Sequence, residues 1–131
     1  MIISRTPFRV SLFGGGTDYP GWFENNSPGS VISFSINKYS YLLTRPLPPF
    51  FDYNYRIRYY KKEEVKKIND IEHPTVRECL KFFKLHNKKI DISHMSDLPA
   101  QSGLGSSSSF TVGLIHSLST MNNIYKTKKE L

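Results

Sequence analysis

The sequence has a single cysteine, Cys79, in 131 residues, which excludes an internal disulfide and a cysteine-based metal cluster. No apolar run approaches the roughly 20 residues that a membrane-spanning helix requires. The segment from Met1 to Arg9 lacks the basic-then-apolar order of a secretory signal. We therefore expect a cytoplasmic domain that does not enter a membrane.

Acidic residues are also scarce: 11 of them face 18 basic residues, which gives a net charge of +7. This surplus suits an anionic partner such as a nucleotide, a phosphorylated metabolite, a nucleic acid or an acidic membrane surface, and does not choose among them. Hydrophobic residues make up 38% and aromatic residues 14% of the chain, enough for a packed core. The length fits one compact domain or one lobe of a larger protein.

Alternation of apolar and polar residues predicts strands over residues 8–13, 31–44 and 55–60. The phase of the alternation shifts near Asn37 and Lys38, which predicts a bulge or bend in the second strand. Prolines at 46, 48 and 49 then indicate a loop. Ile90 and Ile92 indicate a further short strand.

Helical spacing predicts two main helices. Pro74 fits the first turn of a helix with an apolar stripe, and a second, well-buried helix covers residues 105–122. The charged residues 61–69 predict a third, short helix. Thr127 and Glu130 have the spacing of a capping box, which announces a helix. We interpret the sequence as the front part of a longer protein, with a natural short tail as the alternative.

The segment from Tyr53 to Lys62 interleaves aromatic and basic residues. Such a pattern can bind single-stranded nucleic acid by stacking and charge neutralisation. The alternation of Tyr55, Ile57 and Tyr59 with their neighbours favours a half-buried strand instead.

The segment from Pro99 to Ser109 joins a strand to a buried helix and is the motif that carries chemistry. Gly103 and Gly105 let backbone N–H groups turn toward one point, and the helix that follows adds its unpaired N–H donors. Serine hydroxyls can bind phosphate oxygens or a Mg²⁺ ion. The pattern is neither a P-loop nor a dinucleotide fingerprint. We interpret it as a phosphate-binding loop, and a flexible linker followed by an N-cap serine is the alternative.

Two motifs give the sequence a resemblance to the GHMP kinases (galactokinase, homoserine kinase, mevalonate kinase and phosphomevalonate kinase). Pro-x-x-x-Gly-Leu-Gly-Ser-Ser-x-Ser at 99–109 resembles their nucleotide phosphate-binding motif. The segment 7–20 resembles their first motif, and Phe-Gly-Gly-Gly-Thr-Asp-Tyr-Pro within it is most similar to the branch that phosphorylates D-glycero-D-manno-heptose 7-phosphate at the anomeric oxygen. Gly15 and Gly16 differ from the residues of the galactokinase motif, and this difference argues against a plain hexose substrate.

The resemblance implies a role for each matching residue, with ATP and Mg²⁺ as cofactors. Arg9 would offset charge on the transferring phosphoryl group. The sugar phosphate would lie against Gly14, Gly15, Gly16, Thr17, Asp18 and Tyr19. The ATP phosphates would lie against Pro99, Gln101, Ser102, Gly103, Leu104, Gly105, Ser106, Ser107, Ser108 and Ser109, with Ser107 touching Mg²⁺.

The family's catalytic aspartate and its C-terminal glycine-rich motif have no match in the sequence. Residues 1–131 are therefore expected to form an incomplete N-terminal, ATP-binding domain that lacks the C-terminal domain and binds without catalysing. An RNA-binding module, or a non-catalytic ATP-binding regulator, is the alternative function. Because the loop motif is specific, nucleic acid is the less favoured partner; the oligomeric state is left open.

The expected fold class is α+β. From the resemblance, it is the ribosomal protein S5 domain 2-like N-terminal domain of the GHMP kinases, a mixed and mainly antiparallel sheet with helices packed on one side. The expected core residues are Phe8, Val10, Leu12, Ile32, Phe34, Leu80, Phe83, Ile92, Phe110, Leu114 and Leu118.

Overall fold

A computed structural model describes residues 1–26, 28–100, 102–127 and 129–130. Its strands are β1 (Ile2–Phe13), β2 (Ile32–Pro46), β3 (Tyr55–Arg58), β4 (Lys62–Val65) and β5 (Ile90–Ser96). Its helices are α1 (Pro20–Phe23), α2 (Pro74–Phe82) and α3 (Ser106–Met121), with a short 3-10 turn, η1 (Ile68–Asp70).

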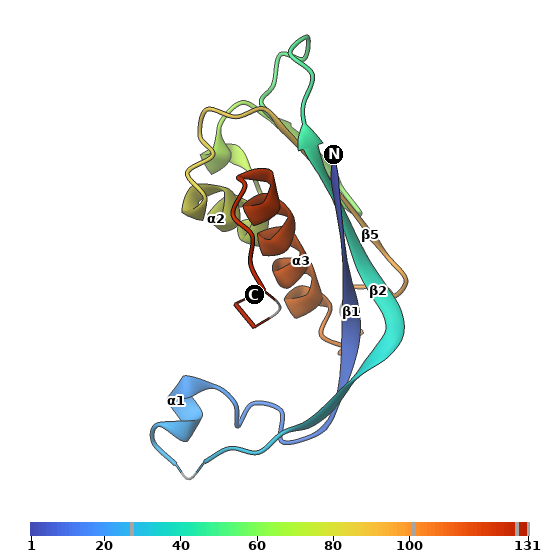
Figure 1. The fold of residues 1–131 in the computed structure, drawn as a ribbon, viewed down its shortest axis with the longest axis vertical. Helices are drawn as coiled ribbons and strands as arrows, with labels where there is room; N and C mark the ends of the chain where they lie inside the picture. The colour runs from blue at the N-terminus through green and yellow to red at the C-terminus, as the bar shows by residue number, and fades with distance from the viewer. Residues whose placement is uncertain (27, 101, 128, 131) are drawn as a thin grey trace.

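The strands form one five-stranded sheet in the order β1-β2-β5-β3-β4. β3 runs parallel to β5, and the other neighbouring pairs are antiparallel. α2 and α3 lie on the same side of the sheet (Figure 1). The mixed sheet with helices on one side confirms the predicted α+β class. Among the described residues, no helix combines the length and the apolar character needed to cross a membrane.

The hydrophobic core fills the space between the sheet and its two long helices. Leu80 of α2 and Leu114 and Leu118 of α3 are fully buried against strand residues such as Ile57 and Ile92. Phe8 and Phe110 are buried too. These positions confirm most of the core that the sequence predicts.

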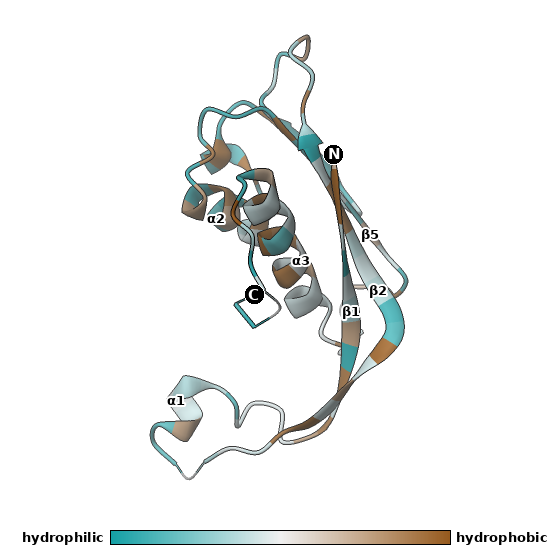
Figure 2. Cartoon of the chain, in the orientation of Figure 1, coloured by the Kyte–Doolittle hydropathy of each residue, from teal (hydrophilic) through white to brown (hydrophobic). Residues whose placement is uncertain are grey.

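Three expected core residues are exposed, and a fourth, Val10, is partly buried outside the core cluster. Leu12, Ile32 and Phe34 are 54%, 60% and 49% exposed, because the end of the β1–β2 hairpin extends past α3 and no described helix covers it. Figure 2 shows apolar residues along this projecting end. Alternation in the sequence distinguishes the two faces of a strand but does not say how far the covering helix reaches.

The second strand contains the predicted bulge. Pro7 pairs with Tyr39 and Arg9 with Ser35, so β2 carries extra residues between these two pairs, around Asn37. The bulge shifts the alternation along β2, as expected from the sequence.

The helix predicted for residues 61–69 is wrong, because the segment forms β4 and η1 instead. β4 pairs with β3, and Glu63 on its inner face is 5% exposed. The Tyr59 hydroxyl donates to Glu63 at 2.7 Å, and the Glu72 N–H donates to it at 2.6 Å. Pairing with β3 and this buried carboxylate outweigh the local helix propensity of charged residues.

α3 packs close to the sheet because small residues line the contact. A Cβ on Gly113 would lie 2.8 Å from Thr6 Oγ1, so only glycine fits there. Ser4 Oγ donates to the Gly113 carbonyl at 2.8 Å, and the hydroxyls of Thr44 and Ser117 lie 3.0 Å apart. These buried polar groups are therefore hydrogen-bonded between helix and strand.

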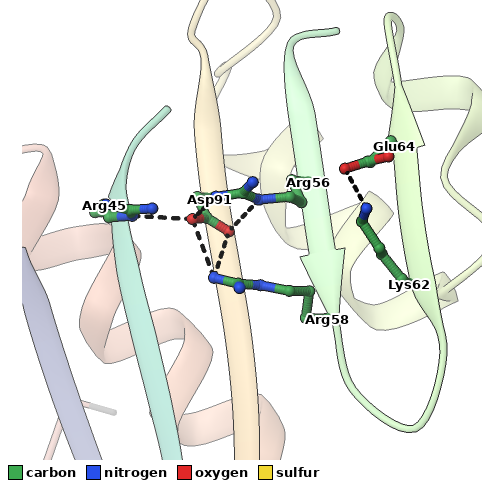
Figure 3. A network of polar contacts seen from close by, with 6 residues as sticks. All are labelled: Arg45, Arg56, Arg58, Lys62, Glu64 and Asp91. Atoms are coloured by element: carbon green, nitrogen blue, oxygen red, sulfur yellow. Dashed lines mark hydrogen bonds and ion pairs between the residues drawn. The ribbon is translucent and has the colours of Figure 1, made fainter. Parts of the chain in front are cut away.

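Asp91 of β5 is a buried carboxylate on the face of the sheet opposite the helices (Figure 3). Its Oδ2 lies 2.9 Å from Arg45 Nε, 2.6 Å from Arg56 Nη2 and 3.2 Å from Arg58 Nη2. Burial by itself raises the pKa of Asp91, but the hydrogen bonds from Arg56 and Arg45 outweigh it, so the pKa of Asp91 lies below its ordinary value. The carboxylate is thus charged in the folded protein and binds β2, β5 and β3 together.

We expect Asp91→Asn to lower the free energy of unfolding by about 3 kcal/mol at pH 7, because it leaves the arginines without their shared anion. Because the pKa of Asp91 is depressed on folding, its contribution is fully present above the unfolded pKa of about 3.9 and is lost as pH falls through the folded value. Urea unfolding between pH 7 and pH 3 measures both effects. The native chain should lose stability below about pH 4 more steeply than Asp91→Asn.

Asp52→Asn, at an exposed carboxylate, is the control and should change stability by less than about 0.5 kcal/mol. Parallel acid profiles for the native chain and Asp91→Asn would contradict the assignment.

Candidate functional site

The glycine–serine loop connects the end of β5 to the start of α3. Gly103 and Gly105 have φ angles of +73° and +72°, a left-handed conformation that side chains with a Cβ disfavour. Gly105 is the N-cap residue of α3, so the loop delivers the chain directly to the helix N-terminus. This is the strand–loop–helix arrangement that a phosphate cradle needs. Gln101, also assigned to ATP binding from the sequence, lies outside the described residues.

Arg9 of β1 meets this loop. Its backbone N–H donates to the Leu104 carbonyl at 3.3 Å. A Cβ on Gly105 would lie 3.1 Å from Arg9 Cγ, so the arginine side chain runs directly along the loop. The fold therefore brings the two sequence motifs together at one point, with an exposed guanidinium-bearing residue beside the loop.

The serines of the loop and the first helical turn have different environments. Ser106 and Ser107 line a pocket, and Ser108 is exposed. Ser109 is 5% exposed, and its hydroxyl donates to the Pro7 carbonyl at 2.9 Å, so it ties α3 to β1. Ser102 Oγ is buried without a hydrogen-bond partner among the described residues.

A pocket of about 430 Å³ opens beside Ser106 and Ser107. The ring of His73 stacks on Phe110 with centroids 4.8 Å apart, and Tyr59 meets His73 edge-on at 5.0 Å. His94 meets Phe110 edge-on at 5.0 Å. The rest of the lining is formed by Tyr60, Thr75, Ser96 and Ala100. The volume and the aromatic wall suit a planar ring system.

Burial of His73, His94 and Tyr59 in the pocket wall shifts the pKa of each toward its neutral form. Burial lowers the pKa of His73, against the opposing charge of Glu63. Burial, and then the neighbouring His73, lower the pKa of His94. Burial, and then the hydrogen bond to Glu63, raise the pKa of Tyr59 far above its usual value. The wall is therefore a neutral aromatic surface next to a loop of N–H donors.

Sequence reasoning did not identify Tyr59, His73, His94 or Phe110 as pocket residues; it expected Phe110 in the core and Tyr59 in a half-buried strand. Tyr59 follows β3, His73 precedes α2, His94 lies in β5 and Phe110 lies in α3. No spacing in the sequence links them, and only the packing of four elements brings their rings into contact.

The segment Gly14–Tyr19 forms a hydrogen-bonded turn before α1. The Gly14 carbonyl accepts from the Thr17 N–H at 3.1 Å and from Thr17 Oγ1 at 2.8 Å. Asp18 Oδ1 accepts from the Gly16 N–H at 3.0 Å, so the carboxylate is held by its own turn. A Cβ on Gly14 would lie 1.8 Å from the Ser30 carbonyl oxygen. Only glycine therefore fits at this position, where the end of β1 passes close to the residues before β2.

This turn does not line the aromatic pocket. Figure 1 shows it with α1 beyond the N-terminal end of α3, past the point where β1 meets the loop. Tyr19 is 70% exposed, and Gly15, Gly16 and Asp18 are exposed as well. Of the predicted site, the structure thus joins Arg9 to the phosphate loop, and places the predicted sugar-binding segment at the far end of the same strand.

The resemblance drawn from the motifs is confirmed by comparison with known proteins. The family described as the GHMP kinases N terminal domain matches residues 74–131. A comparison with curated proteins finds no match.

Solved structures of kinases superpose on nearly the whole chain. A D-glycero-D-manno-heptose 1-phosphate kinase from Bacteriodes thetaiotaomicron superposes with a TM-score of 0.78 at 21% identity, over 99% of this chain and 45% of that chain. The mevalonate kinase of Methanococcus jannaschii gives a TM-score of 0.70 at 20% identity, over 98% and 43%. The Lactococcus lactis galactokinase complexed with galactose gives 0.65 at 19% identity, over 98% and 35%.

At these identities the likeness shows the fold. The chain has the fold of the GHMP kinase N-terminal domain, and it spans less than half the length of these solved structures.

We expect Ser109→Ala to lower the free energy of unfolding by about 1 kcal/mol in the absence of any nucleotide, because it removes the hydrogen bond from the buried Ser109 hydroxyl to the Pro7 carbonyl. Ser108→Ala changes an exposed position one residue earlier and should alter stability by less than about 0.5 kcal/mol. Urea unfolding of both variants measures the difference. Equal stability of the two would show that the Ser109 hydroxyl does not hold α3 on β1.

Proposed function

We propose that this chain is the nucleotide-binding domain of an ATP-dependent sugar kinase. The observation that carries the proposal is the glycine–serine loop, which opens onto an aromatic pocket and contacts Arg9 of the first motif. A loop of N–H donors at a helix N-terminus suits a polyphosphate, and the pocket beside it suits a base.

In this proposal, the triphosphate lies along Ser102–Ser107 and the adenine ring lies in the aromatic pocket. Ser106 and Ser107, which line the pocket, carry the hydroxyls that would contact the phosphates. Ser107 is the candidate ligand for Mg²⁺, which would neutralise phosphate charge when bound. Arg9, beside the loop, would stabilise the charge that develops on the transferring phosphoryl group.

The proposed acceptor is a sugar phosphate, and specifically the anomeric hydroxyl of D-glycero-D-manno-heptose 7-phosphate. The amino-acid sequence of the segment from Phe13 to Pro20 supports this choice, as does the superposition on a heptose phosphate kinase. Gly14–Tyr19 would contact the sugar, with Asp18 accepting hydrogen bonds from its hydroxyls. The net charge of +7 suits an anionic sugar together with ATP.

We further propose that a C-terminal domain completes the kinase. The projecting end of the β1–β2 hairpin exposes apolar side chains far from the core of the described residues, a feature typical of a surface that another unit covers. The residues are Leu12, Phe13, Tyr19, Trp22, Phe23, Ile32 and Phe34.

Binding of Mg-ATP should raise the melting temperature of the 131-residue chain, and Ser107→Leu should abolish the rise. At 100 times the dissociation constant the ligand adds about 2.7 kcal/mol, which is several degrees for a domain of this size. Ser107 lines the pocket, so a leucine there blocks the phosphates. The matched control is Ser33→Leu, at an exposed serine of β2 outside the pocket lining, which should retain the full shift. Absence of any shift in the native chain, or an equal shift in both variants, would contradict the proposed nucleotide site.

The 131-residue chain by itself should show no ATP-dependent phosphorylation of D-glycero-D-manno-heptose 7-phosphate, because no carboxylate in it matches the catalytic aspartate of the family. Attached to the proposed C-terminal domain, the same residues should transfer phosphate. Coupled detection of ADP, with the sugar omitted as the control, measures turnover. Robust turnover by the 131-residue chain on its own would refute the proposal that catalysis requires the C-terminal domain.

A further inference from the structure

The face of the sheet opposite the helices carries a group of arginines that the proposed kinase function does not use. Side chains alternate along a strand, so the neighbours of the buried residues point to the other side. We use the name arginine face for four arginines and the carboxylate that three of them share on that side: Arg5 of β1, Arg45 of β2, Arg56 and Arg58 of β3, and Asp91 of β5. Within the described residues, both long helices lie on the opposite side (Figure 1).

The arginine face has a surplus of positive charge. Asp91 is shared by Arg45, Arg56 and Arg58, and the nearby Lys62 and Glu64 neutralise each other at 2.8 Å (Figure 3). The side chains of Arg45 and Arg58 remain 40% and 45% exposed. A guanidinium has five N–H donors, and Asp91 uses only some of them, so the remainder can bind phosphate oxygens.

Aromatic rings lie among these charges. The Arg5 guanidinium lies 4.5 Å from the centre of the Tyr39 ring, and the Arg56 guanidinium lies 4.9 Å from that of Phe51. Phe51 in turn stacks on Tyr53 at 5.1 Å. Aromatic and guanidinium planes together give bases surfaces to stack on, while arginines track the backbone.

The arginine face also extends across four neighbouring strands. Arg45 and Arg58 converge on Asp91, whereas Arg5 lies on β1, whose backbone is about 14 Å from that of β3 at the usual strand spacing. A second copy of this face would be repelled by the same charge. An isolated phosphate ion would make no use of the rings.

We propose that the arginine face binds single-stranded nucleic acid, with phosphates held by Arg45 and Arg58 and bases stacked on the neighbouring rings. The proposal is independent of the kinase site, because the pocket is lined by residues of α3 such as Ser106 and Phe110, on the helix side of the sheet. It also gives the interleaved Tyr53–Lys62 segment a second use: β3 buries Tyr55 and Ile57 and turns its arginines outward.

The test measures binding of a fluorescent 12-nucleotide oligouridylate to the 131-residue chain by anisotropy, from 50 to 200 mM salt. Arg45→Gln combined with Arg58→Gln removes the two exposed cations and leaves Arg56 on Asp91 to preserve the fold. The matched control is Lys81→Gln combined with Lys84→Gln, which removes the same charge from α2 and the residues after it, on the other side of the sheet. Thermal unfolding confirms that both variants are folded.

We expect the arginine variant to bind the oligonucleotide at least tenfold more weakly and the lysine control to bind within twofold of the native chain. The slope of log affinity against log salt should fall by about 1.4 in the arginine variant, since each phosphate contact on a single strand adds about 0.7. Excess Mg-ATP and Ser107→Leu should leave binding unchanged.

Three outcomes would overturn the proposal. Equal loss in the two charge variants would show general attraction to a basic protein. Full competition by polyglutamate at equal charge would show an acidic-protein surface with no use for bases. Competition by Mg-ATP would place the oligonucleotide in the nucleotide pocket. A failure of ATP to bind in the thermal assay, by contrast, would contradict the proposed nucleotide site and would not affect the proposal for the arginine face.

Discussion

The close contact of α3 with β1 and β2 is the constraint on which the rest of the structure depends. Gly113 brings the helix backbone against Thr6 and Ser4, and the Ser109 hydroxyl fixes its first turn to Pro7. Two residues beyond Pro7, the Arg9 backbone holds the loop through Leu104. The same register that seals the core therefore sets the distance between the arginine and the N-terminus of the helix, which is the geometry that a phosphate site requires.

The two faces of the sheet have different chemistry for a simple reason. On the helix side, burial makes charge costly, so the hydroxyls of Ser4, Thr44 and Ser117 are hydrogen-bonded and the Glu63 carboxylate accepts hydrogen bonds from Tyr59 and Glu72. On the open side, Asp91 is buried only because three arginines surround it, and those arginines keep donors for the solvent. The helix side thus holds a largely aromatic pocket and the open side a cationic surface, so the two proposed binding surfaces lie on opposite sides of one sheet.

The sequence predicted the strands, the two long helices and the β2 bulge because each of these depends on local alternation or spacing. It failed at residues 61–69, where pairing of β4 with β3 and the buried Glu63 overrode a helical composition. It also placed Leu12, Ile32 and Phe34 in the core, since alternation cannot tell a covered strand end from a projecting one. The conformation of the glycine–serine loop and its position before α3 could be predicted because they depend on consecutive residues; its role as a phosphate site stays a prediction. The role of Asp18 as a sugar ligand stays a prediction, since in this structure its carboxylate caps its own turn.

By itself, the sequence determined everything that consecutive residues can encode: the glycines of the loop, the start of α3, the turn at Gly14 and the positive charge of the chain. Only the tertiary structure decided which distant residues meet. The aromatic wall of Tyr59, His73, His94 and Phe110 comes from four separate elements, and the arginines around Asp91 come from two strands on either side of β5. The physical reason is that such contacts depend on strand order and helix docking, which are set by the burial of the whole core. The spacing of residues along the sequence does not reveal them.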